Sequence, residues 1–161
     1  ITGFVCNGDN LIVKVPVVAP PPPQYKNTGK FQNFGLEVAW KYSPVNNLNF
    51  SGNYTYINMK EKLIATPEHS LFLSGNYQWK RFGFNLKMQN VINLYGEKQS
   101  GEVGIIEEGY FLIGTKINYR ALKYLSIFLS AENLLNQDYQ MLYDYPMHGF
   151  SFMSGLNFRL N

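Results

Sequence analysis

The sequence lacks several features that would assign it to common classes of protein. No stretch approaches the roughly eighteen consecutive apolar residues of a transmembrane helix, which excludes a helical membrane protein. Its one cysteine, Cys6, allows no intrachain disulfide and fits no metal-site spacing. Charged residues make up 16% of the chain, and the net charge of +3 is too small and too scattered for a nucleic-acid-binding surface.

Signatures of catalysis and of bound cofactors are also absent. His69 and His148 stand alone, without the spacing of a metal site. Ser70 follows His69 directly, but neighbouring residues of a strand face opposite ways, so they cannot act as nucleophile and base. The pair Glu107–Glu108 is expected on a solvated loop rather than in a cleft. We expect no enzyme, and no catalytic, cofactor-binding or metal-binding residues.

Aromatic residues and glycine are abundant instead. Aromatics reach 16%, with 12 Tyr, 12 Phe and only 2 Trp, beside 14 glycines. The mean hydropathy is -0.21, close to neutral. This composition suits a transmembrane β-barrel, in which apolar and polar residues alternate and average out. A soluble β-sandwich or β-barrel fits the composition almost as well, so the residue pattern must decide.

The last twelve residues, 150–161, show the pattern most clearly. Phe150, Phe152, Leu156 and Phe158 fall on one face of a strand, while small and polar residues fall on the other. A strand of this length exceeds the usual soluble strand but suits a tilted span of a bilayer.

The same alternation recurs along the whole chain. A first strand is expected over 3–15 with a Gly/Asn/Asp interruption, followed by a stiff proline-rich loop at 19–23. Further strands are expected at 31–42, 48–56, 71–79, 82–89, 111–119 and 125–132. With the closing strand these make an all-β, antiparallel, up-and-down arrangement of about eight strands.

Two regularities go beyond alternation. Short connections (43–47, 80–81, 120–123) take turns with long ones (16–30, 58–67, 96–109, 134–149), as periplasmic turns and extracellular loops do in outer-membrane barrels. Aromatic residues gather at the strand ends beside the short connections, which indicates an aromatic girdle at a lipid–water interface. They are Trp40, Tyr42, Tyr77, Trp79, Phe82, Tyr119, Tyr124 and Phe158.

The polar face carries residues such as Asn49, Asn76 and Lys116, which would line a barrel interior. A soluble lipocalin-type barrel produces the same alternation with the faces reversed, so alternation alone leaves both open. Strand length, loop asymmetry and the girdle favour the membrane barrel. Cys6 is then expected to be buried or to face the lumen.

Several motifs resemble the C-terminal part of TonB-dependent outer-membrane receptors. Residues 132–139 match the family pattern "ENL.N..Y", and 143–149 match "Y.YP..G" before a final strand. Residues 25–37, 43–56 and 66–69 match further family segments in the right order, so that the resemblance covers nearly the whole chain. One departure is the end at Arg159, Leu160 and Asn161, where the family usually has a terminal aromatic residue.

The resemblance implies a 22-stranded barrel plugged by an N-terminal domain, of which residues 1–161 form the C-terminal part. Ile1 would then not be the natural N-terminus, and the plug and earlier strands would precede it. Such receptors import a scarce nutrient, such as a ferric siderophore, haem or cobalamin, across the outer membrane, and the TonB complex supplies the energy through the plug. The expected partners are outer-membrane lipid, the missing parts of the receptor, the TonB complex and a small-molecule ligand.

Two alternatives are a small self-contained outer-membrane barrel with a structural or adhesive role, and a soluble lipocalin-like binding barrel. For the receptor, residues near the ligand are expected in 139–148 and in the loop 96–109. The candidates are Tyr139, Tyr143, Tyr145 and His148. A purely structural role for these residues is the competing interpretation, in which Tyr145 and Pro146 shape the loop and Tyr143 packs on a neighbour.

Overall fold

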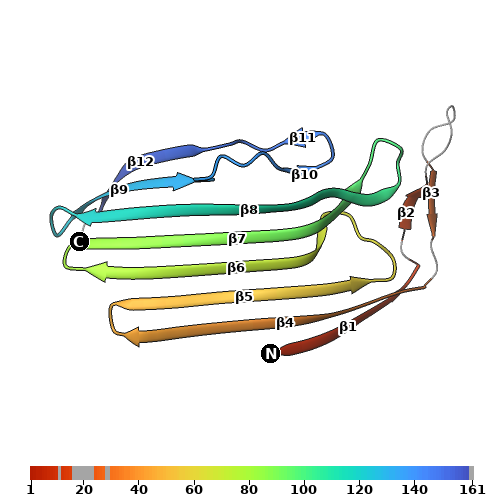
Figure 1. The fold of residues 1–161 in the computed structure, drawn as a ribbon, viewed down its shortest axis with the longest axis horizontal. Coiled ribbons are helices and arrows are strands. Elements are labelled where there is room, and N and C mark those ends of the chain that lie inside the picture. The colour runs from red at the N-terminus through yellow and green to blue at the C-terminus, as the bar shows by residue number, and fades with distance from the viewer. Residues whose placement is uncertain (11, 16–23, 28–29, 160–161) are drawn as a thin grey trace.

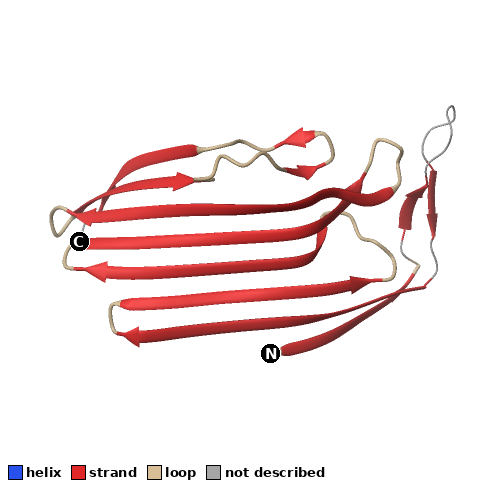
Figure 2. Cartoon of the chain, in the orientation of Figure 1, coloured by secondary structure: helices blue, strands red, loops and turns tan. Residues whose placement is uncertain are grey.

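The computed structural model describes residues 1–10, 12–15, 24–27 and 30–159, and it consists of β-strands and their connections (Figures 1 and 2). Eight strands form one antiparallel sheet in the order β1-β4-β5-β6-β7-β8-β9-β12. The predicted up-and-down arrangement is confirmed, because each of β4 to β8 pairs with its successor in the chain and β9 pairs with the next strand of the same sheet, β12. Among these residues there is no helix long and apolar enough to cross a membrane.

The strands of the large sheet are long, and two small sheets accompany it. The large sheet contains β1 (Thr2–Asp9), β4 (Lys30–Val45), β5 (Leu48–Met59), β6 (Thr66–Trp79), β7 (Phe82–Glu97), β8 (Val103–Arg120), β9 (Leu125–Glu132) and β12 (Ser151–Phe158). The small sheets pair β2 (Ile12–Val15) with β3 (Gln24–Asn27), and β10 (Gln140–Leu142) with β11 (Tyr145–Pro146). The predicted proline-rich loop at 19–23 lies outside the described residues.

The sheet has one apolar and one polar face, as predicted. Residues directly opposite each other in neighbouring strands point to the same side. The apolar face joins Leu73, Met88 and Ile113 across β6, β7 and β8. The polar face joins Asn76, Asn85, Lys116 and Ser130 from β6 to β9. In β12, Phe152, Leu156 and Phe158 lie opposite Ala131, Ile127 and Leu125 of the apolar face.

The two ends of the sheet differ (Figure 1). At one end, called here the short-turn end, tight connections join β4 to β5, β6 to β7 and β8 to β9. At the other, called here the long-connection end, lie the β5–β6 and β7–β8 loops and the β10–β11 sheet. The predicted separation of the tight turns from the other connections is confirmed, although the β7–β8 connection, residues 98–102, is much shorter than expected.

Several sequence-based boundaries were wrong. The closing strand, expected at 150–161, spans eight residues, Ser151–Phe158. The strand expected over 3–15 is split, since Asn10 adopts a left-handed backbone (φ 65) and β2 leaves the large sheet. The loop expected at 96–109 shrinks to residues 98–102, so that Glu107 and Glu108 belong to β8. The turn expected at 43–47 shrinks to Asn46 and Asn47, because β4 continues to Val45 through an irregularity in its pairing with β5.

Aromatic rings meet at the short-turn end, where the girdle was predicted. The Phe82 ring lies 4.8 Å from Tyr119 and 6.1 Å from Trp79, and Tyr77 stacks on Phe84 at 6.3 Å between ring centroids. Trp79 keeps 48% and Tyr124 55% of its surface exposed. Large rings packed side by side but open on one side are typical of residues that face a membrane interface.

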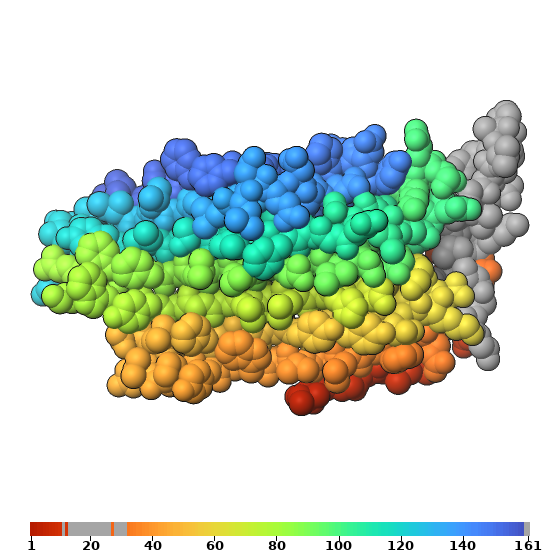
Figure 3. Space-filling model, viewed as in Figure 1, coloured from red at the N-terminus to blue at the C-terminus, as the bar shows by residue number. Residues whose placement is uncertain are grey.

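The sheet buries few side chains. The space-filling view shows β4 to β12 side by side as one continuous surface (Figure 3). Within the described part of the chain, a cluster of buried residues lies toward the long-connection end and contains Val91, Leu94, Ile106 and Tyr110, with Leu112 and Tyr139 packed against it. Apolar side chains elsewhere, such as Leu86 at 48% and Leu129 at 50% exposure, lack a second layer among the described residues. Exposure of this extent on one face indicates a wall between two media rather than a domain with its own core.

Gly52 makes room on the apolar face for the Trp40 side chain. A methyl group at Gly52 would come within 2.7 Å of the Trp40 indole and 2.8 Å of Leu73 Cδ2. At Gly75, on the same face of the next strand, the nearest atoms belong to Phe50 at 3.4 Å. We therefore expect Gly52→Ala to displace Trp40 and to lower the free energy of unfolding by about 1–3 kcal/mol.

The matched variant Gly75→Ala is expected to leave the stability unchanged or slightly raised, since alanine restricts the unfolded chain. Denaturant titration followed by tryptophan fluorescence measures both. Equal effects of the two substitutions would contradict the packing of Trp40 over Gly52.

Candidate ligand-binding site

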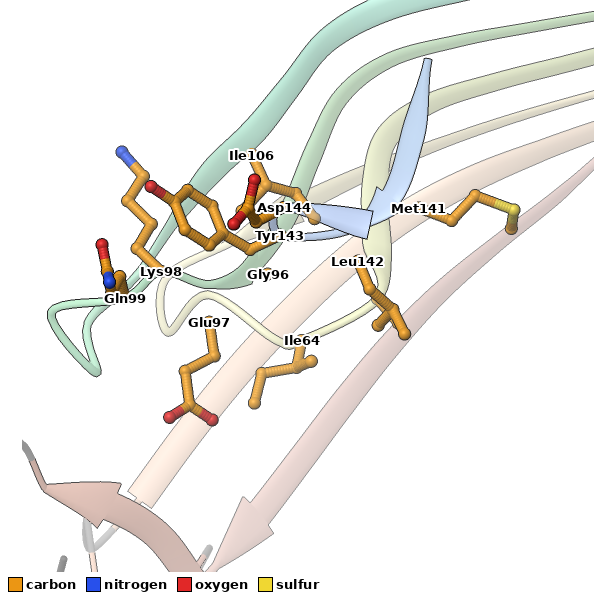
Figure 4. Close-up of a pocket in the computed structure, with 11 residues that line it drawn as sticks. Ile64, Gly96, Glu97, Lys98, Gln99, Ile106, Met141, Leu142, Tyr143 and Asp144 are labelled. Atoms are coloured by element: carbon orange, nitrogen blue, oxygen red, sulfur yellow. The ribbon is translucent and has the colours of Figure 1, made fainter. Parts of the chain in front are cut away.

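A cavity of about 440 Å³ lies at the long-connection end, where three connections meet (Figure 4). The β5–β6 loop contributes Ile64 and Ala65, the end of β7 and the following loop contribute 96–99, and the β10–β11 hairpin contributes 141–144. These segments are far apart in the sequence and are brought together by the meander. A cavity built in this way can change its lining without changing the sheet that carries it.

The lining combines apolar surface with charged and phenolic groups. Ile64, Ile106 and Leu142 supply apolar surface. Lys98, Asp144 and Tyr143 supply an ammonium, a carboxylate and a hydroxyl group. Apolar walls with a few convergent polar groups are typical of sites for small organic ligands.

The β10–β11 hairpin is fixed to β8 mainly through Gln140. Its backbone N–H donates to Glu107 Oε2 at 3.1 Å, and its side-chain amide donates to the Ile106 carbonyl. Its amide oxygen accepts a hydrogen bond from the backbone N–H of Asp144 at 3.0 Å. Gln140 thus ties the hairpin both to β8 and to its own tip, which places Tyr143 and Asp144 at the cavity.

The segment that leads into the hairpin is organised by Asn133, which is 4% exposed. Its side-chain amide donates to the carbonyls of Gln137 (2.9 Å) and His148 (3.4 Å), and its Oδ1 accepts from the Gln137 N–H at 2.9 Å. The Gln137 side chain in turn accepts from the Phe111 N–H of β8 at 2.7 Å. Asn133 therefore joins the start and the end of the long connection between β9 and β12.

A second cavity, of about 320 Å³, opens on the polar face. Lys87 of β7 and Glu132 of β9 form an ion pair of 2.8 Å across it. The strand between them carries Gly114, where a methyl group would come within 2.6 Å of Glu132 Oε2 and 2.7 Å of Lys87 Cε. Glycine at this position lets two charged side chains meet above the middle strand.

The structure distributes the four predicted ligand-proximal residues over different places. Tyr143 lines the first cavity, while Tyr139 and His148 line the second. Tyr145 is 69% exposed and lines neither of these two cavities. Tyr139 also packs its ring 4.7 Å from Tyr110, so that part of its role is structural.

Most of the remaining lining of the first cavity lies within the ranges 96–109 and 139–148, where ligand-proximal residues were expected. Ile64 and Ala65 of the β5–β6 loop lie outside these ranges and carried no motif that marked them, because their place in the lining depends on contacts between distant segments. The predicted loop 96–109 does contribute Glu97, Lys98 and Gln99, although the connection is shorter than expected.

The other residues considered for chemistry have structural surroundings. His69 Nδ1 lies 2.8 Å from the Tyr54 hydroxyl, and the His69 ring stacks on Tyr56 at 4.9 Å. Cys6 is exposed and pairs in register with Asn33, which places it on the polar face. No group of three or more His, Cys, Asp or Glu side chains that could hold a metal ion occurs within the described part of the chain.

Comparison with known folds gives a consistent result. The chain superimposes on the siderophore receptor PiuA from Acinetobacter baumannii with a TM-score of 0.77 and 17% identity, covering 97% of this chain and 25% of the receptor. The ferric-catecholate import receptor Fiu from E. coli K12 gives a TM-score of 0.72 and 21% identity, covering 97% of this chain and 24% of the receptor. The copper transporter OprC gives a TM-score of 0.79 and 15% identity, covering 97% of this chain and 27% of the transporter. The chain thus spans about a quarter of the length of these proteins.

Sequence comparison identifies the family. No curated protein matches the chain. Residues 1–134 match the family model described as "TonB dependent receptor-like, beta-barrel", which is most of the chain. The match agrees with the ordered motifs of the sequence and with the polar and apolar faces of the sheet, and it sets aside the lipocalin-like alternative. The chain belongs to the TonB-dependent receptor β-barrel family.

Proposed function

We propose that this chain is the C-terminal part of an outer-membrane receptor that actively imports a scarce, metal-bearing small molecule such as a ferric siderophore. The family match over residues 1–134 carries this proposal. Solved receptors with the same fold are described as a siderophore receptor, a ferric-catecholate import receptor and a copper transporter. In the whole receptor, a plug domain and further strands would complete the barrel, and the TonB complex would drive transport through the plug.

The sheet suits the role of barrel wall. Its apolar face would contact outer-membrane lipid and its polar face would line the lumen, since polar residues alternate inward in large barrels. The long-connection end would face the outside, and the 440 Å³ cavity would lie where an incoming ligand arrives. Among the four candidate residues, Tyr143 is the one that lines this cavity, so we assign it the first contact with the ligand.

Uptake of iron-55 bound to a panel of siderophores tests the function. We expect cells that produce the full-length receptor to accumulate the metal from at least one siderophore, and only when the TonB complex is intact. Deletion of the receptor gene serves as the baseline. Accumulation that continues without the TonB complex would contradict active import.

Tyr143→Ala tests the site. Loss of an aromatic contact in a binding pocket costs about 1–2 kcal/mol, so we expect the ligand affinity to fall by about 5- to 30-fold. Tyr124→Ala is the matched control, because Tyr124 is an exposed tyrosine at the short-turn end. Binding titrations with the transported ligand measure both variants. An affinity unchanged in Tyr143→Ala would remove this cavity from the binding site.

A further inference from the structure

Positive charge is concentrated at the short-turn end. Six exposed cations lie in or beside the three tight turns and at the end of β12. We call this group the basic rim; it consists of Lys41, Lys80, Arg81, Arg120, Lys123 and Arg159. Lys80, Arg81 and Lys123 belong to the turns themselves, and the other three stand near the ends of β4, β8 and β12.

Negative charge is missing from the same end. The stretches 38–60, 69–96, 109–131 and 145–161 contain no Asp or Glu, and they include all three turns and β12. The ion pair of Lys87 with Glu132 lies farther along the strands, at the second cavity. The cations of the basic rim are therefore not neutralised by carboxylates of this part of the chain.

Hydrogen bonds to backbone carbonyls hold the turns and the end of β12 against one another. The Arg120 N–H donates to the Arg81 carbonyl at 2.9 Å, and the Arg81 guanidinium donates to the Ala121 carbonyl at 3.3 Å. The Arg159 N–H donates to the Tyr124 carbonyl at 3.0 Å. The spacing of the cations is thus set by the sheet and not by mobile loops.

The basic rim adjoins the aromatic girdle. The Lys80 ammonium lies 5.3 Å from the centre of the Trp79 ring, and Lys123 directly precedes Tyr124. Tryptophan and tyrosine prefer the boundary between hydrocarbon and water, and neighbouring Lys and Arg side chains extend toward the polar layer. The turn cations would therefore sit at the depth of lipid phosphates.

We propose that the basic rim binds the headgroups of anionic phospholipids, of the phosphatidylglycerol type, in the leaflet that meets the short turns. This inference rests on the proposed function, because it requires the chain to span a bilayer. Lys80, Arg81 and Lys123 make the contacts, while the other three cations raise the local potential. Fixed cations beside interfacial aromatics fit a charged membrane surface better than a soluble polyanion. Binding would hold the barrel at a defined depth.

The test uses the full-length receptor with Cys6→Ser in phosphatidylcholine nanodiscs, with a fluorophore attached through Leu122→Cys. Leu122 is 47% exposed and lies in the turn between β8 and β9, so the probe reports on lipids beside this part of the rim. The nanodiscs contain a quencher-labelled phosphatidylglycerol or an equally labelled phosphatidylethanolamine. We expect phosphatidylglycerol to be enriched about fivefold or more near the probe, and the enrichment to vanish at about 1 M salt.

In the variant Lys80→Gln/Arg81→Gln/Lys123→Gln, we expect the ratio of phosphatidylglycerol to phosphatidylethanolamine near the probe to fall close to one. The matched variant Lys60→Gln/Lys62→Gln/Lys98→Gln, which removes three cations from the long-connection end, is expected to keep the enrichment. Equal quenching by both lipids in the unaltered receptor, or an enrichment that survives the rim substitutions or high salt, overturns the inference.

Further outcomes distinguish a failure of the lipid-binding inference from a failure of the proposed function. Binding of the receptor to isolated peptidoglycan through the basic rim, without lipid enrichment, would replace the lipid by a cell-wall polymer and overturn the inference. A full-length receptor that remains in the aqueous phase and does not enter nanodiscs would overturn the proposed function, and the inference with it. A receptor that enters nanodiscs and shows no lipid preference overturns the inference alone.

Discussion

Leu86→Arg is expected to destabilise the receptor by about 2–4 kcal/mol, because it places a charge on the lipid-facing side of the barrel near the middle of the bilayer. Leu86 is 48% exposed on the apolar face and pairs with Gly75 and Thr115. It lies four residues from Phe82 of the girdle, or about 13 Å along the strand, which is close to the centre of an apolar band about 25 Å tall.

Gln89→Arg is the matched control on the same strand. Gln89 pairs with Phe72 and Leu112 on the polar face and lines the second cavity. An arginine there can remain hydrated in the lumen, so we expect a change below about 1 kcal/mol. Denaturant titration of the full-length receptor in phospholipid vesicles measures both. If Gln89→Arg lowers the free energy of unfolding as much as Leu86→Arg or more, the assignment of the apolar face to lipid and the polar face to the lumen is contradicted.

Asn133→Ala is expected to cost about 2–4 kcal/mol and to loosen the connection from β9 to β12. The substitution removes three hydrogen bonds of a side chain that is 4% exposed, and it takes these partners from the half-buried backbone groups of Gln137. Asn133 also has a left-handed backbone (φ 49), which alanine adopts at a further cost. Hydrogen exchange of residues 133–150, combined with denaturant titration, measures the effect.

Two variants separate these contributions. Asn133→Gly removes the hydrogen bonds but tolerates the backbone, so the difference from Asn133→Ala reports the backbone cost. Asn136→Ala is the matched control, since Asn136 has a similar backbone (φ 50) but is exposed and accepts one hydrogen bond, from Phe150 at 2.8 Å. Equal losses for Asn133→Ala and Asn136→Ala would show that burial of the Asn133 network is unimportant.

Much of the sheet was predictable because its side chains alternate with a period of two. The strand expected at 125–132 coincides with β9, and Phe152, Leu156 and Phe158 fall on the apolar face as expected. The girdle was also predictable, because Trp79 and Tyr119 stand directly beside short turns that are marked by polar residues. Local patterns of this kind need no knowledge of distant contacts.

The errors arose where the period of two is interrupted. Asn93 has a left-handed backbone (φ 53), and the pairing of β7 with β8 shifts between Leu94 and Tyr95. Beyond this bulge the alternation of apolar and polar residues changes phase. The sequence pattern therefore predicted ends of β7 and β8 that are too early, and a loop over 96–109. Asn10 ends β1 in the same way, where an interruption within one strand was expected.

The candidate site was less accessible from the sequence than the sheet. Tyr143 was singled out by its residue type and its position on a long connection, and it does line the first cavity. Tyr145 is of the same residue type and lies on the same connection, yet it is 69% exposed and lines neither the first nor the second cavity. The different positions of Tyr143 and Tyr145 depend on how Gln140 fixes the hairpin to β8, and no local sequence motif predicts these contacts.

Membrane accessibility along β8 tests the central claim most directly. Nitroxide labels are attached one at a time to cysteines introduced at positions 111–119 of the full-length receptor, in which Cys6→Ser removes the exposed native thiol. In vesicles the labels report collisions with oxygen in lipid and with a nickel chelate in water. We expect Phe111, Ile113, Ile117 and Tyr119 to favour oxygen, and Leu112, Lys116 and Asn118 to favour the chelate, with a period of two. A reversed alternation, or access of the chelate to every position, would contradict a wall between lipid and lumen.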